Sequence, residues 1–114
     1  MKLICDHQAK AYYGQKEYLW AAEKWKKARE YDGTSQAFLF NIGSCYAALY
    51  ETANAEGTIN GHPADAPKLL EMALSYYDMF IEMATDKGID LDEETKQMIT
   101  DAQAYIERYQ KGDD

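Results

Sequence analysis

The run Phe38 to Tyr46, FLFNIGSCY, places a glycine in the middle of an unbroken helical pattern of aromatic, aliphatic and small residues. A glycine inside a helix costs about 1 kcal/mol relative to alanine, so it usually serves a packing purpose. We expect Gly43 to mark a close crossing of this helix with another one. Ile42, Gly43 and Tyr46 then face the core.

The rest of the chain also has the composition of a helical domain. Its 114 residues include only two prolines and seven glycines, while alanine, glutamate, lysine and leucine are frequent. Apolar residues recur at spacings of three and four, which predicts amphipathic helices rather than strands. The sequence therefore predicts a single all-α domain of five helices, over residues 2–14, 17–31, 35 to the low fifties, 66–85 and 90–111.

Short polar and glycine-containing segments separate these helices. Gly14 is expected to take the left-handed conformation at the end of the first helix, and Asn60-Gly61 predicts a turn in the loop-like segment 53–67. Other residues expected to form turns, cap helices or end them are Asp32-Gly33-Thr34, Thr34 or Ser35, Asp65, Lys87-Gly88 and the acidic run Asp90 to Glu93.

Three helices show a clear apolar face. In the second helix the face expected to turn inward comprises Tyr18, Ala21, Ala22, Trp25, Ala28 and Tyr31. In the fourth it comprises Leu69, Leu70, Ala73, Tyr76, Tyr77, Phe80 and Met83, and in the fifth Met98, Ala102, Tyr105 and Tyr109. This spacing indicates that most of the tyrosines pack in the core rather than stack on a sugar or a base.

The sequence matches itself at two offsets. A shift of 34 residues places Ala9 on Gly43 and Tyr12 on Tyr46, and a shift of 52 places Ala21 on Ala73. One repeat of 34 residues with an 18-residue insertion before Pro67 explains both offsets.

These residues resemble the tetratricopeptide repeat family, and the run FLFNIGSCY also resembles a bacterial, envelope-associated subset of it. The resemblance is carried in the first unit by Ala11-Tyr12-Tyr13, Tyr18, Ala21, Trp25 and Ala28, and in the second by Asn41-Ile42-Gly43, Tyr46, Leu70, Ala73 and Tyr77. It implies a right-handed stack of two helical hairpins and a C-terminal capping helix: unit one is 1–33, unit two is 34–88 with an insertion near 52–66, and the cap is 90–111.

The resemblance also implies a concave groove lined by the first helix of each unit. The residues that would face it are Asp6, Lys10, Tyr13, Phe40, Asn41, Ser44 and Ala48. Asn41 matches an asparagine with which some members bind a peptide's terminal carboxylate, whereas Asp6 and Lys10 replace the lysine and asparagine of those members. An apolar anchor at Phe40 beside polar Asn41 and Ser44 suits a bound peptide. These side chains could equally pack against the next helix.

The net charge of −8 disfavours nucleic acid and anionic membranes as partners. No stretch reaches the 18 apolar residues of a membrane span, so no membrane insertion is predicted. We expect a cytoplasmic protein if the chain is complete, and a periplasmic or envelope-associated one if a signal peptide was removed. The N-terminal helix is a candidate surface for homo-oligomer formation.

Signals for catalysis are weak. Cys5, His7 and Cys45 could contribute to a zinc site, but no fourth ligand is evident, and nothing orients His62 as a base for Cys45. The acidic run Asp90 to Glu94 lacks the glycine and spacing of a calcium loop. We therefore expect no enzyme, metal or cofactor, and no disulfide between the two cysteines.

The function predicted is that of a non-catalytic adaptor or scaffold that binds a peptide or protein segment in the groove. The alternative is a chaperone-like protein that holds a secreted or assembly partner. A small metal-binding or hydrolytic protein is a third interpretation.

Overall fold

The chain folds into five helices and one short β-hairpin. A computed structural model describes residues 2–31, 33, 36–86 and 91–111, with side chains for 4–31, 33, 36–86 and 91–109. Its elements are α1 (Lys2–Gly14), α2 (Tyr18–Tyr31), α3 (Gln36–Glu56), β1 (Thr58–Ile59), β2 (His62–Pro63), α4 (Ala66–Thr85) and α5 (Glu93–Lys111). The all-α prediction is confirmed.

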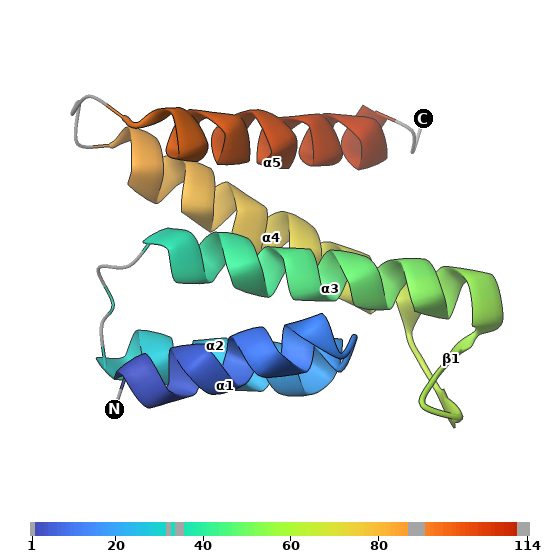
Figure 1. The fold of residues 1–114 in the computed structure, drawn as a ribbon. Coiled ribbons are helices and arrows are strands. Elements are labelled where there is room, and N and C mark those ends of the chain that lie inside the picture. The colour runs from blue at the N-terminus through green and yellow to red at the C-terminus, as the bar shows by residue number, and fades with distance from the viewer. Residues whose placement is uncertain (1, 32, 34–35, 87–90, 112–114) are drawn as a thin grey trace.

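Successive helices pack on one another. The main contacts join α1 to α2, α2 to α3, α3 to α4 and α4 to α5, and the α3–α4 contact is the most extensive. Figure 1 shows α1 and α2 at one end of this stack, α3 and α4 in the middle and α5 at the other end. In Figure 1 the two helices of each pair, α1–α2 and α3–α4, run in opposite directions.

The core is centred on α3. α2 packs on one flank of this helix and α4 on another, so α3 buries more residues than any other described helix, while the face with Asn41 and Ser44 is only half-buried. The largest fully buried side chains are Phe80, Leu39, Ile42 and Cys45. Three of the four belong to α3, so the run that contains Gly43 forms the middle of the core.

Gly43 lies where α3 crosses α4. A Cβ atom at this position would stand 2.8 Å from Cδ1 and 3.0 Å from Cε1 of the Tyr77 ring. The first distance is shorter than real Cβ contacts and the second is tighter than most of them, so glycine at this position lets the ring lie against the α3 backbone. The predicted close crossing is confirmed, and its partner is a tyrosine of the fourth helix.

Aromatic rings fill the remaining space between the later helices. Phe40 of α3 lies 5.5 Å from Tyr77 and 5.2 Å from Phe80, measured between ring centroids. Tyr77 in turn contacts Tyr105 of α5 edge-on at 5.3 Å. Edge-to-face and tilted pairs at these distances are the favoured geometries of aromatic rings. These contacts hold α3, α4 and α5 together.

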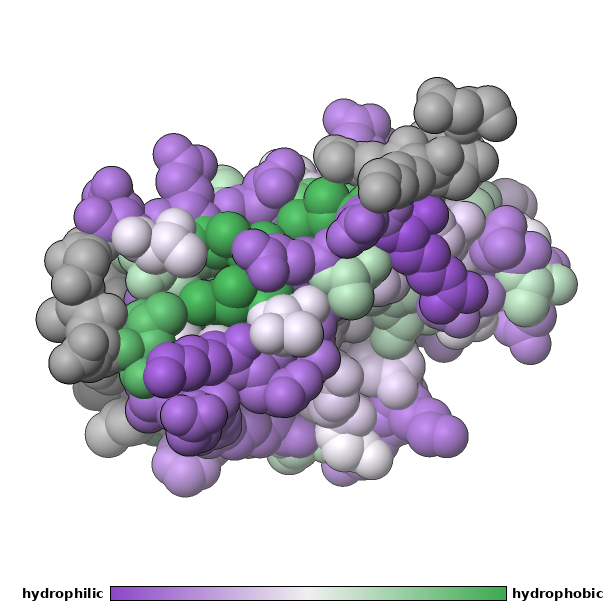
Figure 2. All heavy atoms as spheres, turned by 90° about the horizontal axis from the view of Figure 1, so that it is seen from above, coloured by the Kyte–Doolittle hydropathy of each residue, from purple (hydrophilic) through white to green (hydrophobic). Residues whose placement is uncertain are grey.

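α5 covers the far end of the stack, and its surface there carries both apolar and hydrophilic side chains. Ala102 is fully buried, while Met98, Ile99, Tyr105 and Ile106 are half-buried against the core. Figure 2 looks onto this end and shows hydrophobic residues in the middle of the face with hydrophilic ones on both sides. Some apolar surface therefore remains uncovered at the α5 end.

Two helix caps follow the sequence prediction. The Asp65 side chain accepts a hydrogen bond from the Lys68 amide at 3.2 Å, and α4 begins at the next residue. The Asp92 carboxylate accepts one from the Thr95 amide at 2.7 Å at the start of α5. Both satisfy a backbone N–H group that the helix leaves free. Other predicted cap and turn residues, namely Asp32, Thr34, Ser35, Lys87, Gly88 and Asp90, lie outside the described residues.

The chain leaves α1 through Lys16 rather than Gly14. Lys16 has a φ of 63°, and Gly14 is not among the residues with positive φ. The left-handed conformation therefore falls two residues later than predicted, because the backbone of Glu17 bonds back to the Tyr12 carbonyl at 2.9 Å. The prediction for Gly14 was wrong.

The inward prediction for Tyr31 was also wrong. This side chain at the last position of α2 is 60% exposed, whereas Ala21, Ala22, Trp25 and Ala28 are buried as expected. The last turn of α2 is therefore not covered at the position of Tyr31.

The insertion contains more regular structure than predicted. α3 continues to Glu56, and β1 and β2 pair antiparallel, with Ile59 opposite His62. Asn60 and Gly61 have φ of 53° and 80°, the combination of a type I′ turn. The Asn-Gly turn prediction is confirmed, but the two strands were missed.

Candidate functional site

A hollow of about 530 Å³ lies between α1, α3 and the start of α5. We call it the α1/α3/α5 hollow. The residues that line it are Asp6, Lys10, Gln36, Ala37, Phe40, Asn41, Phe80, Asp92, Glu94, Thr95 and Met98. It brings together four of the residues predicted to face a groove, namely Asp6, Lys10, Phe40 and Asn41.

One side of the hollow is apolar. Phe40 and Met98 are half-buried in its wall, and Phe80 behind them is fully buried. Phe40 is fixed by its contacts with the Tyr77 and Phe80 rings. A side chain held by two neighbouring rings can contact an apolar ligand group with little further loss of conformational freedom.

Asn41 is the polar group next to this apolar wall. Its side chain is half-buried, and its amide forms no hydrogen bond with another described residue. An amide has two donors and an acceptor, so it can bond to both a carbonyl and an N–H group of an extended backbone. Asn41 is thus placed to bind the main chain of a ligand.

Asp6 has a structural partner as well as a place in the hollow. Its carboxylate accepts a hydrogen bond from Trp25 Nε1 at 2.8 Å and lies 3.2 Å from Lys10 Nζ. The Asp6 side chain is 17% exposed and that of Lys10 is 64% exposed. Asp6 therefore joins α1 to α2, while the Lys10 ammonium can swing toward a ligand.

Three predicted groove residues do not line the hollow. Tyr13 packs edge-on against Tyr18 at 5.1 Å, and burial, together with the nearby Cys45 thiol, raises the pKa of its phenol. The Ser44 hydroxyl donates to the Phe40 carbonyl at 3.0 Å and lies 3.0 Å from the Tyr77 hydroxyl. Ala48 is half-buried on α3. These side chains contribute to helix packing.

The start of α5 supplies lining residues that were not predicted as site residues. Asp92, Glu94, Thr95 and Met98 come from the segment predicted only to cap the stack. Nothing in the repeat pattern indicates where the fifth helix begins relative to α1. The acidic run at its start is a signal in the sequence, but such a run predicts a helix start.

The described residues show no cluster suited to metal binding or nucleophilic catalysis. No group of three or more His, Cys, Asp or Glu side chains converges among them. Cys5 is half-buried and Cys45 is buried, and both are free thiols. Burial raises the pKa of the Cys45 thiol to about 12, which keeps it protonated at neutral pH and unsuited to nucleophilic attack.

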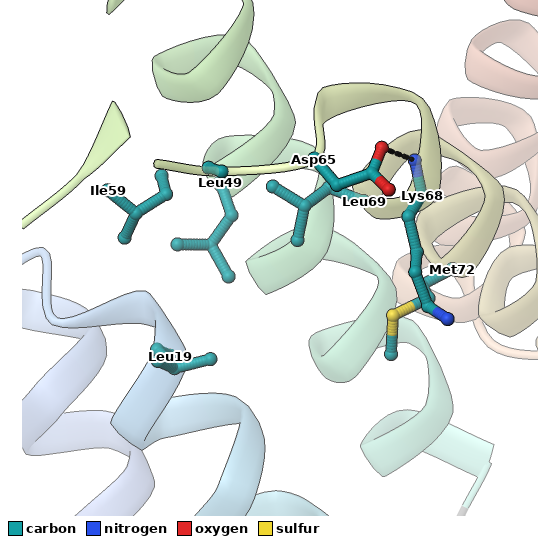
Figure 3. Close-up of a pocket in the computed structure, with 8 residues that line it drawn as sticks. Leu19, Leu49, Ile59, Asp65, Lys68, Leu69 and Met72 are labelled. Carbon is teal, nitrogen blue, oxygen red and sulfur yellow. Dashed lines mark hydrogen bonds between the residues drawn. The ribbon is translucent and has the colours of Figure 1, made fainter. Parts of the chain in front are cut away.

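A second, smaller cavity of about 230 Å³ lies beside the insertion. We call it the hairpin pocket; its lining residues are Leu19, Leu49, Ile59, Ala64, Asp65, Lys68, Leu69 and Met72. Figure 3 shows the Leu19, Leu49, Ile59 and Leu69 side chains pointing toward one shared space. The insertion thus contributes Ile59 to an apolar recess formed with α2, α3 and α4.

No protein-family model, curated protein sequence or solved structure matches this chain. Among the described residues, no helix is long and apolar enough to cross a membrane.

Proposed function

We propose that this chain is a non-catalytic interaction module that binds a segment of another protein in the α1/α3/α5 hollow. The observation that carries the proposal is the pairing of Phe40, an apolar group held rigid in the wall, with Asn41, an amide without a partner among the described residues. Phe40 suits contact with an apolar side chain of the ligand, and Asn41 suits hydrogen bonds to the backbone of the ligand.

We further propose that the fold is a right-handed stack of two tetratricopeptide-like hairpins and a capping helix. Three features support this architecture. The helices pack in chain order, Gly43 accommodates a ring of the following helix, and the hollow opens on the first helix of each hairpin. Helical repeats bind segments along such a surface because each unit contributes one helix to it.

Peptide selection tests this function. A displayed library of random 12-residue peptides is selected against the folded chain, and synthetic versions of the enriched peptides are titrated by fluorescence anisotropy. Asn41→Ala should weaken their binding about tenfold, since a lost hydrogen bond to a ligand backbone costs about 1.4 kcal/mol. The matched control is Asn54→Ala, an exposed asparagine on the same helix outside the hollow, which should leave binding unchanged.

The outcomes separate the hollow from the insertion. If the enriched peptides bind Asn41→Ala as tightly as the original chain, the hollow is not the binding site. If their binding is lost when residues 56–64 are deleted and the helical content is unchanged, the hairpin pocket is the site instead. Enrichment of no peptide at all would contradict peptide binding as the function.

A chaperone-like holder of an assembly partner is the second candidate. It is favoured by one observation: the exposed large apolar side chains among the described residues all lie on α1 and α2. They are Ile4, Tyr13, Leu19, Trp20 and Tyr31. Exposed apolar surface can bind unfolded segments without sequence preference. Suppression of light scattering by an unfolding client, lost in Trp20→Ser but kept in Asn41→Ala, distinguishes this function from groove binding.

A further inference from the structure

The charges around the α1/α3/α5 hollow are unequal. Among the described residues, its lining includes three carboxylates, those of Asp6, Asp92 and Glu94, and one ammonium, that of Lys10. Lys10 lies 3.2 Å from Asp6, so these two charges compensate each other. The negative charges of Asp92 and Glu94 remain.

Neither remaining acid is neutralised within the described part of the chain. The ion pairs formed there join Lys10 to Asp6, Lys26 to Glu23, and Lys96 to Glu93. Hydrogen bonds from the Thr95 side chain and from the Thr95 amide lower the pKa of the Asp92 carboxyl group and favour the ionised form. Both carboxylates are exposed to solvent at the edge of the hollow.

The acidic edge borders the apolar wall. Met98 lies on the same helix as Glu94, one turn further along, and Phe40 faces the hollow from α3. A peptide bound against the apolar wall would therefore place its neighbouring residues beside the carboxylates of Asp92 and Glu94. The net charge of −8 adds a long-range attraction for cationic partners and repels anionic ones.

We propose that the segment bound in the hollow is cationic, with a lysine or arginine beside an apolar anchor residue. The apolar side chain lies against Phe40 and Met98, and the basic group lies beside Asp92 and Glu94. This inference rests on the proposed function and adds the chemistry of the partner to it.

Asp92 and Glu94 also stabilise α5, because negative charges near a helix N-terminus interact favourably with the helix dipole. A test must therefore remove their charge and keep the helix. Asp92→Asn retains a good capping side chain, and Glu94→Gln retains the size of the original. The double variant loses two negative charges. Its matched control carries two exposed acids changed on α2, Glu23→Gln and Glu30→Gln, outside the hollow.

The experiment uses the random 12-residue library on the original chain and both double variants, at 50 mM NaCl. On the original chain and on the α2 control, the selected peptides should contain more lysine and arginine than aspartate and glutamate near an apolar residue. On Asp92→Asn/Glu94→Gln this excess should disappear. A synthetic cationic peptide should bind that variant about fivefold more weakly, and binding to the original chain should weaken as NaCl rises to 500 mM.

The results separate the two proposals. Selected peptides that depend on Asn41 but show no basic excess would overturn the cationic partner and leave groove binding intact. A basic excess that persists in Asp92→Asn/Glu94→Gln would overturn it too, because the attraction would then come from the overall charge. If no selected peptide depends on Asn41, groove binding fails and the cationic partner fails with it.

Discussion

The two helical hairpins of the stack bury apolar residues of different sizes. The α3–α4 hairpin contains the largest fully buried side chains, Phe80, Leu39, Ile42 and Cys45. The α1–α2 hairpin buries mainly alanines, with Trp25 as its one large buried side chain in the described part of the chain. The first hairpin therefore packs by close approach of its helices, and the second by filling space with large side chains.

The two hairpins also differ in the apolar side chains that they expose to solvent. The exposed large apolar side chains among the described residues belong to α1 and α2, including Leu19 at 43% and Trp20 at 56%. Because burial of large side chains dominates stability, we expect the second hairpin to set the stability of the domain. The first hairpin should depend more on specific polar contacts such as the Trp25–Asp6 hydrogen bond.

The largest effect is expected from Phe80→Ala. Phe80 is fully buried between α3 and α4, and removal of such a ring costs about 3–5 kcal/mol of unfolding free energy. Leu19→Ala in the first hairpin should cost below about 1 kcal/mol, because Leu19 is partly exposed. Urea unfolding followed by circular dichroism measures both. If Phe80→Ala does not fold, Phe80→Leu provides the value. Equal losses in the two hairpins would contradict the comparison.

The reactivity of the two free thiols provides a second comparison of the hairpins. At pH 8 an alkylating reagent should modify Cys45 of the second hairpin at least about 100-fold more slowly than Cys5 of the first, because Cys45 is buried and protonated. Mass spectrometry of partly labelled protein gives both rates. In 8 M urea the two rates should become similar, and equal rates in the folded protein would show that Cys45 is accessible.

The raised pKa values also predict loss of stability at high pH. Burial raises the pKa of the Cys45 thiol from 9.0 to about 12 and raises that of the Tyr77 phenol above 10.0. The unfolded chain releases these protons at lower pH than the folded one. The stability present below about pH 9 should therefore fall as pH rises toward 12. Urea midpoints at pH 8 and pH 10.5 test this, and an unchanged midpoint would contradict it.

Gly43→Ala tests the helix crossing itself. The added methyl group must displace the Tyr77 ring, which costs about 1–3 kcal/mol, and the higher helix propensity of alanine returns up to about 1 kcal/mol. A net loss of about 1–2 kcal/mol is expected. Gly14→Ala is the control, because a Cβ atom there meets nothing within 4 Å, and it should be neutral or slightly stabilising.

The smallest loss of unfolding free energy is expected from substitutions at the polar contacts of Asp6 in the first hairpin. Asp6→Asn keeps an acceptor for Trp25 Nε1 but loses the charge, so it should cost about 0.5–1 kcal/mol. Lys10→Ala breaks only a largely exposed ion pair and should cost below about 0.5 kcal/mol. Thermal melts at equal protein concentration compare them. A larger loss for Lys10→Ala would show that the ion pair, rather than the tryptophan contact, holds α1.

The helices could be predicted from the sequence because their determinants are local. The bounds of α1 and α4 follow from apolar spacing and from the Asp65 cap, and Gly43 marked the crossing. The conformation at Lys16 could not be predicted, since it depends on how the chain enters α2. Tyr31 has the correct spacing for an inward residue, but whether a neighbour covers that position is a property of the tertiary structure.

The candidate site was predictable only on the helices of the repeat pattern. Phe40 and Asn41 were predicted as groove residues from the resemblance, and both line the hollow. Asp92 and Glu94 lie more than 50 residues further along the chain, and their place in the same hollow as Asn41 depends on how α5 packs. Contacts between helices, such as that of Tyr77 with Tyr105, position α5 against α4, and no local sequence pattern specifies them.

The successive packing of the helices has a consequence for how the domain opens. In a linear stack the end elements can detach while the middle stays folded, so amide exchange should be slowest in α3 and α4. The α1/α3/α5 hollow takes residues from both ends and the middle of this stack. A ligand seated there contacts the elements that open first and reduces their separate motions. The occupied domain would then unfold as one cooperative unit.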